Sequence, residues 1–111
     1  MAKFTVRVEL HGVKGIEPSG EDYQELHLAM QRNSYFRIIK SSDDEWSHLP
    51  SAEYTVNWDV KIDSVVNEVK TIVAAVWKPF SVLVTESNGR QWYGLKPASS
   101  DEVAELLRTD V

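Results

Sequence analysis

The order in which the hydrophobic spacing changes along the chain constrains the fold of this sequence more than any other feature. Alternating apolar and polar residues are typical of a half-buried strand, whereas apolar residues three and four apart are typical of a helix packed on one side. The patterns follow the order strand, helix, strand, strand, helix, strand, over residues 4–10, about 19–33, 35–40, 52–58, 62–76, and from 80 onward. With 111 residues the chain suffices for one hydrophobic core, and we expect a single domain over residues 1–111.

The two long helical segments carry recognisable ends. Ser19 is suited to cap the first helix, with Glu21 and Asp22 in the first turn near the positive end of the helix dipole. The second helix has a stripe of valine and isoleucine over four turns, follows Asp59 as a candidate cap and ends before Pro79. Because valine is a weak helix former, packing on the sheet must stabilise this second helix.

An Asn-Gly turn at residues 88–89 follows the last strand and favours a two-residue type I′ hairpin. The register of such a hairpin brings Tyr93 and Leu95 to the core face of the sheet. Trp92 is left on the opposite face together with Leu83. The turn therefore predicts one additional strand after the sixth element.

Ser99 and Glu102 have the spacing of a capping box and predict a short C-terminal helix. The elements before this helix define a fold class. The order of the preceding elements indicates an α+β ferredoxin-like sandwich of the type β-α-β-β-α-β. We expect an antiparallel sheet that two helices cover on one face and that the extra C-terminal hairpin strand extends.

The composition excludes several classes of function. No apolar run approaches the ~20 residues of a membrane span, and the N-terminus has no signal-peptide pattern, so we expect a cytoplasmic protein that does not enter a membrane. Without cysteine the chain has no disulfide, no thiolate nucleophile and no cysteine metal ligand. The net charge of -5 disfavours broad electrostatic binding of nucleic acid but permits a local basic strip. We expect neither a cofactor nor a metal, and chemistry carried by histidine, carboxylate, hydroxyl or basic side chains.

Arg7, Glu9 and His11 follow one another on the polar face of the first strand. Alternate residues of a strand share one face and lie about 7 Å apart, so the three side chains form a row. Metal-free cleavage of RNA needs a base for the 2′-hydroxyl, an acid for the leaving oxygen and a cation for the phosphorane charge. This row is the candidate catalytic group, to which a neighbouring strand could add Thr85. The alternative is a solvated or dimer-facing sheet surface.

Arg90 and Trp92 place a cation and an aromatic ring on the helix-free face, where they are suited to hold phosphate and to stack a single-stranded base. Arg37 is the third candidate RNA-binding residue. Convergence of Arg7, Arg37 and Arg90 on this face would favour RNA as the partner. The alternative is a homodimer, formed through the sheet face or the edge strand, that buries Leu83 and Trp92.

The remaining histidines and acidic residues have structural interpretations. His27 is expected at the edge of the apolar stripe of the first helix, and His48 lies beside Trp46 in a loose hairpin excursion. The acidic residues 43–45 lack the spaced ligands and central glycine of a calcium loop, so we interpret them as a solvated turn.

Three segments carry a resemblance to a known family: FTVRVELH at 4–11, SAEY at 51–54 and FSVLVTESNGRQWY at 80–93. In this order they resemble small bacterial and phage proteins grouped with the GhoS-type endoribonuclease antitoxins of type V toxin-antitoxin systems. The likeness spans residues 3 to about 97. It implies a ferredoxin-like fold, similar to that of small CRISPR-associated nucleases, and an antitoxin that cuts the messenger RNA of a membrane toxin. Those nucleases carry an acidic metal ligand, usually Asp, at the end of the first strand, where this chain has Glu9 and His11.

Two hypotheses of different class follow. The first is an endoribonuclease antitoxin that recognises single-stranded RNA on the helix-free face. The second is a non-enzymatic regulatory dimer, of phage or mobile-element type, that uses the same face to bind another protein. The resemblance favours the first hypothesis, and the acidic net charge favours the second.

Overall fold

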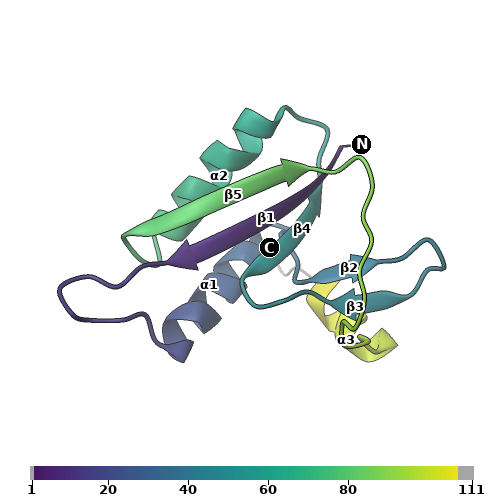
Figure 1. The fold of residues 1–111 in the computed structure, drawn as a ribbon, viewed down its shortest axis with the longest axis horizontal. Helices are drawn as coiled ribbons and strands as arrows, with labels where there is room; N and C mark the ends of the chain where they lie inside the picture. Colours follow the sequence, from purple (N-terminus) through teal and green to yellow (C-terminus); the bar gives the residue numbers. More distant parts are fainter. Residues whose placement is uncertain (1, 108–111) are drawn as a thin grey trace.

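The computed structural model describes residues 2–107 as a mixed α+β protein with an antiparallel sheet (Figure 1). The elements, in chain order, are β1 (Lys3–Leu10), α1 (Gly20–Arg32), β2 (Ile38–Lys40), β3 (Trp46–His48), β4 (Glu53–Asn57), α2 (Ile62–Ala74), β5 (Phe80–Glu86) and α3 (Ser100–Leu107).

The main sheet has three strands in the order β4-β1-β5, with both pairs antiparallel. At the centre of the sheet Val6 of β1 lies between Tyr54 of β4 and Val84 of β5. On the outer side of β4, Phe36 and Thr55 form an isolated bridge through two backbone hydrogen bonds of 3.0 and 2.7 Å. Both α1 and α2 lie on one face of the sheet, and no helix of residues 2–107 covers the opposite face (Figure 1).

The core lies between the sheet and these two helices. Every second residue of β1 is buried, as the alternation predicts, and these side chains meet the buried faces of α1 and α2. The cluster consists of Phe4, Val6, Val8, Leu10, Leu26, Met30, Tyr35, Tyr54, Val56, Val65, Val69 and Val73. The valine stripe of α2 therefore packs on the sheet, which explains how a segment of weak helix formers stays helical.

The ends of α1 are those that the sequence predicts. The Ser19 hydroxyl accepts a hydrogen bond from the backbone N–H of Asp22, and the Asp22 carboxylate accepts one from the backbone N–H of Ser19, completing a capping box. The helix ends at Asn33. The second helix differs from the prediction at its start, because its N-cap is Lys61, which makes no side-chain cap, rather than Asp59.

A second region, which we name the hairpin lobe, consists of β2, β3, α3 and the segment 96–99. The β2–β3 hairpin projects beyond the main sheet, and α3 lies beside it (Figure 1). The chain before α3 is bound to β3 by backbone hydrogen bonds of 2.8 Å, from His48 N to Lys96 O, and 3.0 Å, from Ala98 N to Trp46 O. The predicted C-terminal helix is therefore present, with Val103 buried and Leu107 exposed.

The extra strand predicted after the Asn-Gly turn is absent from the described residues. The chain turns away from β5 after Glu86 and crosses to β3, so residues 87–97 make no strand with β5. Tyr93, which the hairpin register would bury, is 100% exposed. The prediction was wrong here because turn propensity is a local property, whereas the partner of a strand is decided by distant packing.

None of the helices in the described part of the chain is long and apolar enough to cross a membrane.

Candidate functional site

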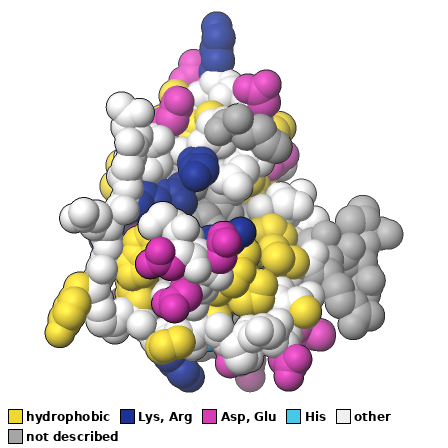
Figure 2. Space-filling model, turned by 90° about the vertical axis from the view of Figure 1, so that its right-hand side faces the viewer, with side chains coloured by type: hydrophobic (Ala, Val, Ile, Leu, Met, Phe, Trp, Pro, Cys, Tyr) yellow, Lys and Arg dark blue, Asp and Glu magenta, His cyan; other side chains and the backbone are white. Residues whose placement is uncertain are grey.

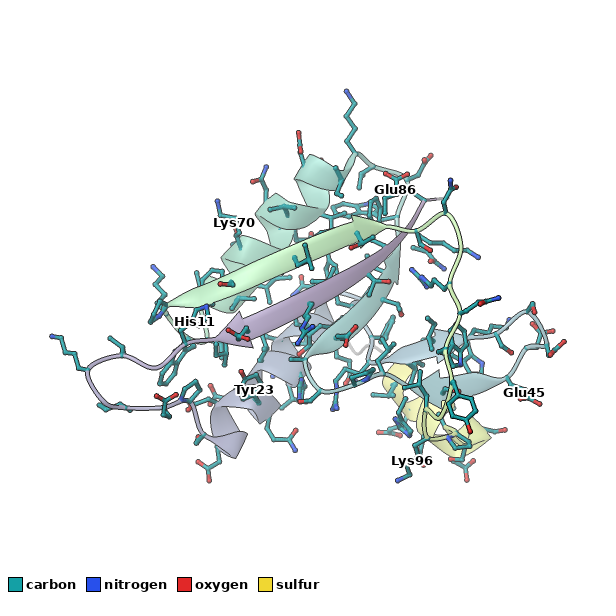
Figure 3. All side chains as sticks on the ribbon, in the orientation of Figure 1. His11, Tyr23, Glu45, Lys70, Glu86 and Lys96 are labelled. Atoms are coloured by element: carbon teal, nitrogen blue, oxygen red, sulfur yellow. The ribbon has the colours of Figure 1, made fainter. Side chains whose placement is uncertain are left out.

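The helix-free face of the sheet, which we name the open face, carries polar side chains from three strands. They come from alternate positions: Thr5, Arg7 and Glu9 of β1, Glu53, Thr55 and Asn57 of β4, and Ser81 and Thr85 of β5, together with Leu83. His11 continues the row of β1 at one end of the sheet (Figure 3). The hairpin lobe, marked in the same view by Glu45 and Lys96, lies at the opposite end.

His11 uses both ring nitrogens in side-chain contacts. Its Nε2 lies 2.6 Å from Ser81 Oγ, and its Nδ1 lies 3.3 Å from Glu9 Oε1. A carboxylate only accepts hydrogen bonds, so the contact with Glu9 assigns the ring proton to Nδ1. Nε2 is then the acceptor, and the Ser81 hydroxyl donates to it. Glu9, His11 and Ser81 are therefore linked by one charge contact and one hydrogen bond, and we name these three residues the His11 cluster.

The backbone of His11 is held on both sides. Its N–H donates to the carbonyl of Pro79 at 3.0 Å, and its carbonyl accepts a 2.8 Å hydrogen bond from the indole Nε1 of Trp77. Glu9 and Ser81 are direct partners in the β1–β5 register. All three side chains of the cluster are therefore placed by regular strands or by fixed backbone contacts, which favours a defined geometry.

The structure brings together only part of the predicted catalytic row. Glu9 and His11 contact each other as expected, but Arg7 lies between Glu53 and Leu83 across the sheet. Thr85 is the partner of Thr5, closer to the opposite end of β1.

Ser81 is the residue at this end of the sheet that the sequence alone did not single out. Only the pairing of β1 with β5 identifies it, because that register places Ser81 directly opposite Glu9. Without the register, Ser81, Leu83 and Thr85 are equivalent positions on one strand face.

At the other end of the open face lies a groove of about 710 Å³. It is formed where β4 and the start of β1 meet the hairpin lobe and the coil that follows β5. The lining includes both predicted residues Arg90 and Trp92, and it adds Lys3, Lys40, Phe36 and Trp46. Figure 2, which looks onto the side of the molecule with the hairpin lobe, shows basic side chains gathered beside hydrophobic ones, with acidic side chains at their margin.

Arg90 is the most unusual group in this groove. Its Nε and Nη2 atoms are buried and have no hydrogen-bond partner within the described residues. Burial lowers the pKa of Arg90, yet a guanidinium stays protonated in proteins. A buried cationic donor without a partner is costly, so an acceptor that reached these two atoms would stabilise this end of the molecule.

Lys40, a second cation of the groove, lies beside an aromatic ring and a carboxylate. The Lys40 ammonium lies 5.8 Å from the centre of the Trp46 ring, within the range of a cation–π contact, and 3.1 Å from the Asp44 carboxylate. Asp44 also lines the groove, so three cations and one carboxylate contribute to it. The acidic turn 43–45 is exposed, in agreement with its interpretation as a solvated turn.

Arg37 does not join the other arginines. It lines a separate cavity of about 200 Å³ together with His27 and Gln31 of α1, on the helix side of the molecule. The convergence of Arg7, Arg37 and Arg90 that would favour RNA as the partner is therefore not seen. The bridge between Phe36 and Thr55 fixes the strand so that the next side chain, Arg37, turns toward α1.

His27 and His48 both have structural partners. His27 Nδ1 lies 2.6 Å from the Tyr54 hydroxyl, and burial, followed by the charge of Arg37, lowers the pKa of His27 from 6.5 to about 4. At neutral pH this imidazole is therefore uncharged. His48 Nε2 contacts the Glu102 carboxylate and so ties β3 to α3.

In the described part of the chain, no group of three or more histidine and carboxylate residues is placed to hold a metal ion.

No protein-family model, no curated protein and no solved structure matches this chain. The candidate site is therefore defined by its geometry. A cluster of contacting Glu, His and Ser side chains lies at one end of an open sheet face, and an aromatic groove lies at the other, with an arginine that is unsatisfied among the described residues.

Proposed function

We propose that this protein is a single-stranded RNA-binding endoribonuclease that works without a metal. The observation that carries the proposal is the groove, which Arg90 lines together with Phe36, Trp46 and Trp92, and in which two Arg90 donors have no partner among the described residues. Single-stranded nucleic acid is held by this combination, because phosphate accepts hydrogen bonds from a guanidinium while bases stack on aromatic rings. The three cations of the groove supply a local basic site on a chain of net charge -5.

Cleavage is assigned to the His11 cluster. His11 Nε2 is an acceptor in an exposed position, so it can take the proton of a substrate 2′-hydroxyl that replaces the Ser81 hydroxyl. Glu9 contacts Nδ1 and stabilises the imidazolium that forms. This imidazolium gives the proton to the leaving 5′-oxygen, so that a 2′,3′-cyclic phosphate and a 5′-hydroxyl end are released. Arg7, farther along the same strand face, contributes a cation to the path of the RNA backbone. The extended backbone from Lys3, which lines the groove, to His11 spans about 27 Å. This length leaves room for several nucleotides between the groove and the His11 cluster.

The fold itself supports a finer proposal. If the Phe36–Thr55 bridge counts as a reduced fourth strand, the order from β5 through β1 and β4 to Phe36 is that of a ferredoxin-like sheet. This order agrees with the resemblance to GhoS-type antitoxins, from which we infer a role in cutting the messenger RNA of a toxin. In that role the protein would act in the cytoplasm.

Binding is tested with fluorescently labelled single-stranded RNA pools. We expect Arg90→Gln and Trp92→Ala each to weaken binding at least tenfold, and Arg32→Gln, an exposed arginine of α1, to leave binding unchanged. Equal binding by all three variants would contradict the assignment of the groove.

Cleavage is tested with the same pools in the presence and absence of EDTA. We expect cut products that persist in EDTA and that disappear in a folded His11→Gln variant. Cleavage that EDTA abolishes would contradict a metal-free mechanism, and intact RNA throughout would restrict the function to binding.

A second candidate function is non-enzymatic binding to a protein partner or to a second copy of this chain. It is favoured by the acidic net charge, by Leu83, which is 63% exposed on the open face, and by the outer edge of β5, which pairs with no strand of the described residues. Light scattering of the wild type and of Leu83→Lys tests this alternative. A dimer that the substitution dissociates would support a homodimer through the β5 edge or the open face.

A further inference from the structure

We propose that Ser81, His11 and Glu9 form a nucleophilic triad that hydrolyses small acyl esters at the end of the open face. This activity goes beyond the cleavage of RNA. It shares the His11–Glu9 pair with that proposal but needs neither the groove nor RNA.

The first argument is the relation of the three side chains. A serine becomes nucleophilic when a base lies within hydrogen-bonding distance of its hydroxyl and a third group orients that base. Ser81 Oγ lies 2.6 Å from His11 Nε2, and Glu9 Oε1 lies 3.3 Å from His11 Nδ1. The carboxylate fixes the tautomer that leaves Nε2 free to receive the serine proton. Base, orienting group and nucleophile are thus in the order that acyl transfer requires.

The second argument is that the cluster is rigid where it is attached and open where a substrate must enter. Glu9 and Ser81 are on paired strands, and the backbone of His11 is fixed by Pro79 and Trp77. The contact between His11 and Ser81 is solvent-exposed. An ester can therefore approach Ser81 without any movement of the fold.

The third argument concerns the groups around the reacting carbonyl. The hydrogen bonds from His11 N to Pro79 O and from Ser87 N to Lys3 O direct the odd-numbered residues of β5 toward β1. The N–H of Val82, the residue after Ser81, therefore points to the outer edge of β5, where the described residues place no further strand. The backbone N–H of the residue that follows the nucleophile is suited to donate a hydrogen bond to the oxyanion of an acyl intermediate. Leu83, two residues from Ser81 on the same face, offers apolar contact for a small acyl group.

The reaction proceeds in two balanced steps. Ser81 Oγ attacks the carbonyl carbon, its proton moves to His11 Nε2, and the ester bond breaks as the leaving alcohol takes that proton. Water then attacks the acyl-serine, gives a proton to His11 Nε2, and the acid is released as this proton returns to Ser81. Glu9 stabilises the imidazolium in both steps and is not itself consumed. The net reaction is ester plus water to acid plus alcohol, with no oxidant or co-reactant.

The test is covalent labelling with a fluorophosphonate probe, together with hydrolysis of p-nitrophenyl acetate. We expect one label per chain, mapped to Ser81 by peptide mass spectrometry, and a hydrolysis rate that falls at least tenfold in Ser81→Ala. The matched control is Ser64→Ala, an exposed serine of α2 that lies outside the cluster. It should keep both the label and the rate.

Further variants separate the triad from a merely reactive surface. Glu9→Gln keeps the shape of the side chain and removes its charge, so we expect slower labelling in a protein whose circular dichroism is unchanged. Hydrolysis that is equal in the wild type and Ser81→Ala, or a label spread over other residues, would overturn the proposal.

The same variants distinguish the triad from the ribonuclease. RNA supplies its own nucleophile in the 2′-hydroxyl, so Ser81→Ala should keep RNA cleavage and lose ester hydrolysis, while His11→Gln should lose both. A Ser81 label without RNA cleavage supports the triad alone. RNA cleavage without a Ser81 label overturns the triad and leaves the ribonuclease standing.

Discussion

The main sheet with α1 and α2 and the hairpin lobe are held together by different means. The core of the first region is continuous, and Leu26, Val6 and Val69 from three of its elements are fully buried in it. The hairpin lobe has a few buried side chains of its own. It is otherwise held together by backbone hydrogen bonds between β3 and the segment 96–99 and by the contact of His48 with Glu102. The His11 cluster lies wholly in the first region, whereas the groove needs both. Perturbing the lobe should therefore affect the groove and spare the cluster.

The largest effect is expected from a cavity in the core of the first region. Leu26→Ala removes a fully buried side chain between α1 and the sheet and should lower the free energy of unfolding by about 3 kcal/mol. Urea unfolding followed by circular dichroism measures this. A loss below about 1 kcal/mol would show that the region tolerates cavities, and would remove the contrast in packing between the two regions.

The next effect is a pH dependence confined to the first region. The pKa of His27 is about 4 in the folded protein and 6.5 for a histidine free of these surroundings, so the unfolded chain binds this proton first as the pH falls. The contribution of His27 is complete above pH 6.5 and is lost progressively as the pH falls toward 4. We expect a loss on the order of 2 kcal/mol over this range, after allowance for the partial exposure of the ring.

The control for this pH dependence is His27→Gln, which keeps a polar partner for Tyr54 and cannot titrate. The difference in stability between pH 7 and pH 5 should shrink in the variant. An identical pH profile in both proteins would show that other groups carry the dependence.

A smaller and more local pair of effects is expected from the helix caps. Ser19→Ala removes the cap of α1 and should lower the global free energy of unfolding by about 1 kcal/mol. Ser99→Ala removes the hydroxyl that accepts from the N–H of Glu102, and should increase hydrogen exchange in α3 while leaving the global unfolding transition in place. If Ser99→Ala shifts the global transition as far as Ser19→Ala does, the two regions unfold as one unit.

The smallest effect is expected from the tie between β3 and α3. Glu102→Gln should cost less than about 1 kcal/mol, because both partners are partly exposed. Faster hydrogen exchange in α3, together with weaker RNA binding and unchanged labelling of Ser81, is the expected result. Glu105→Gln, a neighbouring change on the same helix, should have none of these effects.

The elements that the sequence predicts well are those decided by neighbouring residues. The N-cap at Ser19 and the alternation of β1 are local signals, and both have their expected structure. The Asn-Gly turn at 88–89 is also a local signal, but the following chain finds its partner in β3, more than 40 residues earlier. Pairing between segments so far apart cannot be predicted from the residues of one segment alone.

The same distinction explains the site. The contact of Glu9 with His11 follows from two positions on one strand, and the sequence predicts it. The contact of His11 with Ser81 depends on the register of strands 70 residues apart, and the sequence leaves Ser81 equivalent to its neighbours. Arg37 lies apart from Arg7 and Arg90 because the bridge at Phe36 sets the direction of its side chain, and this bridge joins residues that are distant in the sequence.

The hydrogen bond from Trp77 to the carbonyl of His11 has a practical consequence. The indole N–H of Trp77 is bonded to the backbone of the residue whose imidazole lies at the centre of the cluster. Its proton resonance, one of four tryptophan indole signals in the chain, is therefore a natural spectroscopic probe of that end of the sheet. The indole signals of Trp46 and Trp92 report on the groove at the opposite end. A single two-dimensional spectrum can thus follow both ends of the open face at once without any added label.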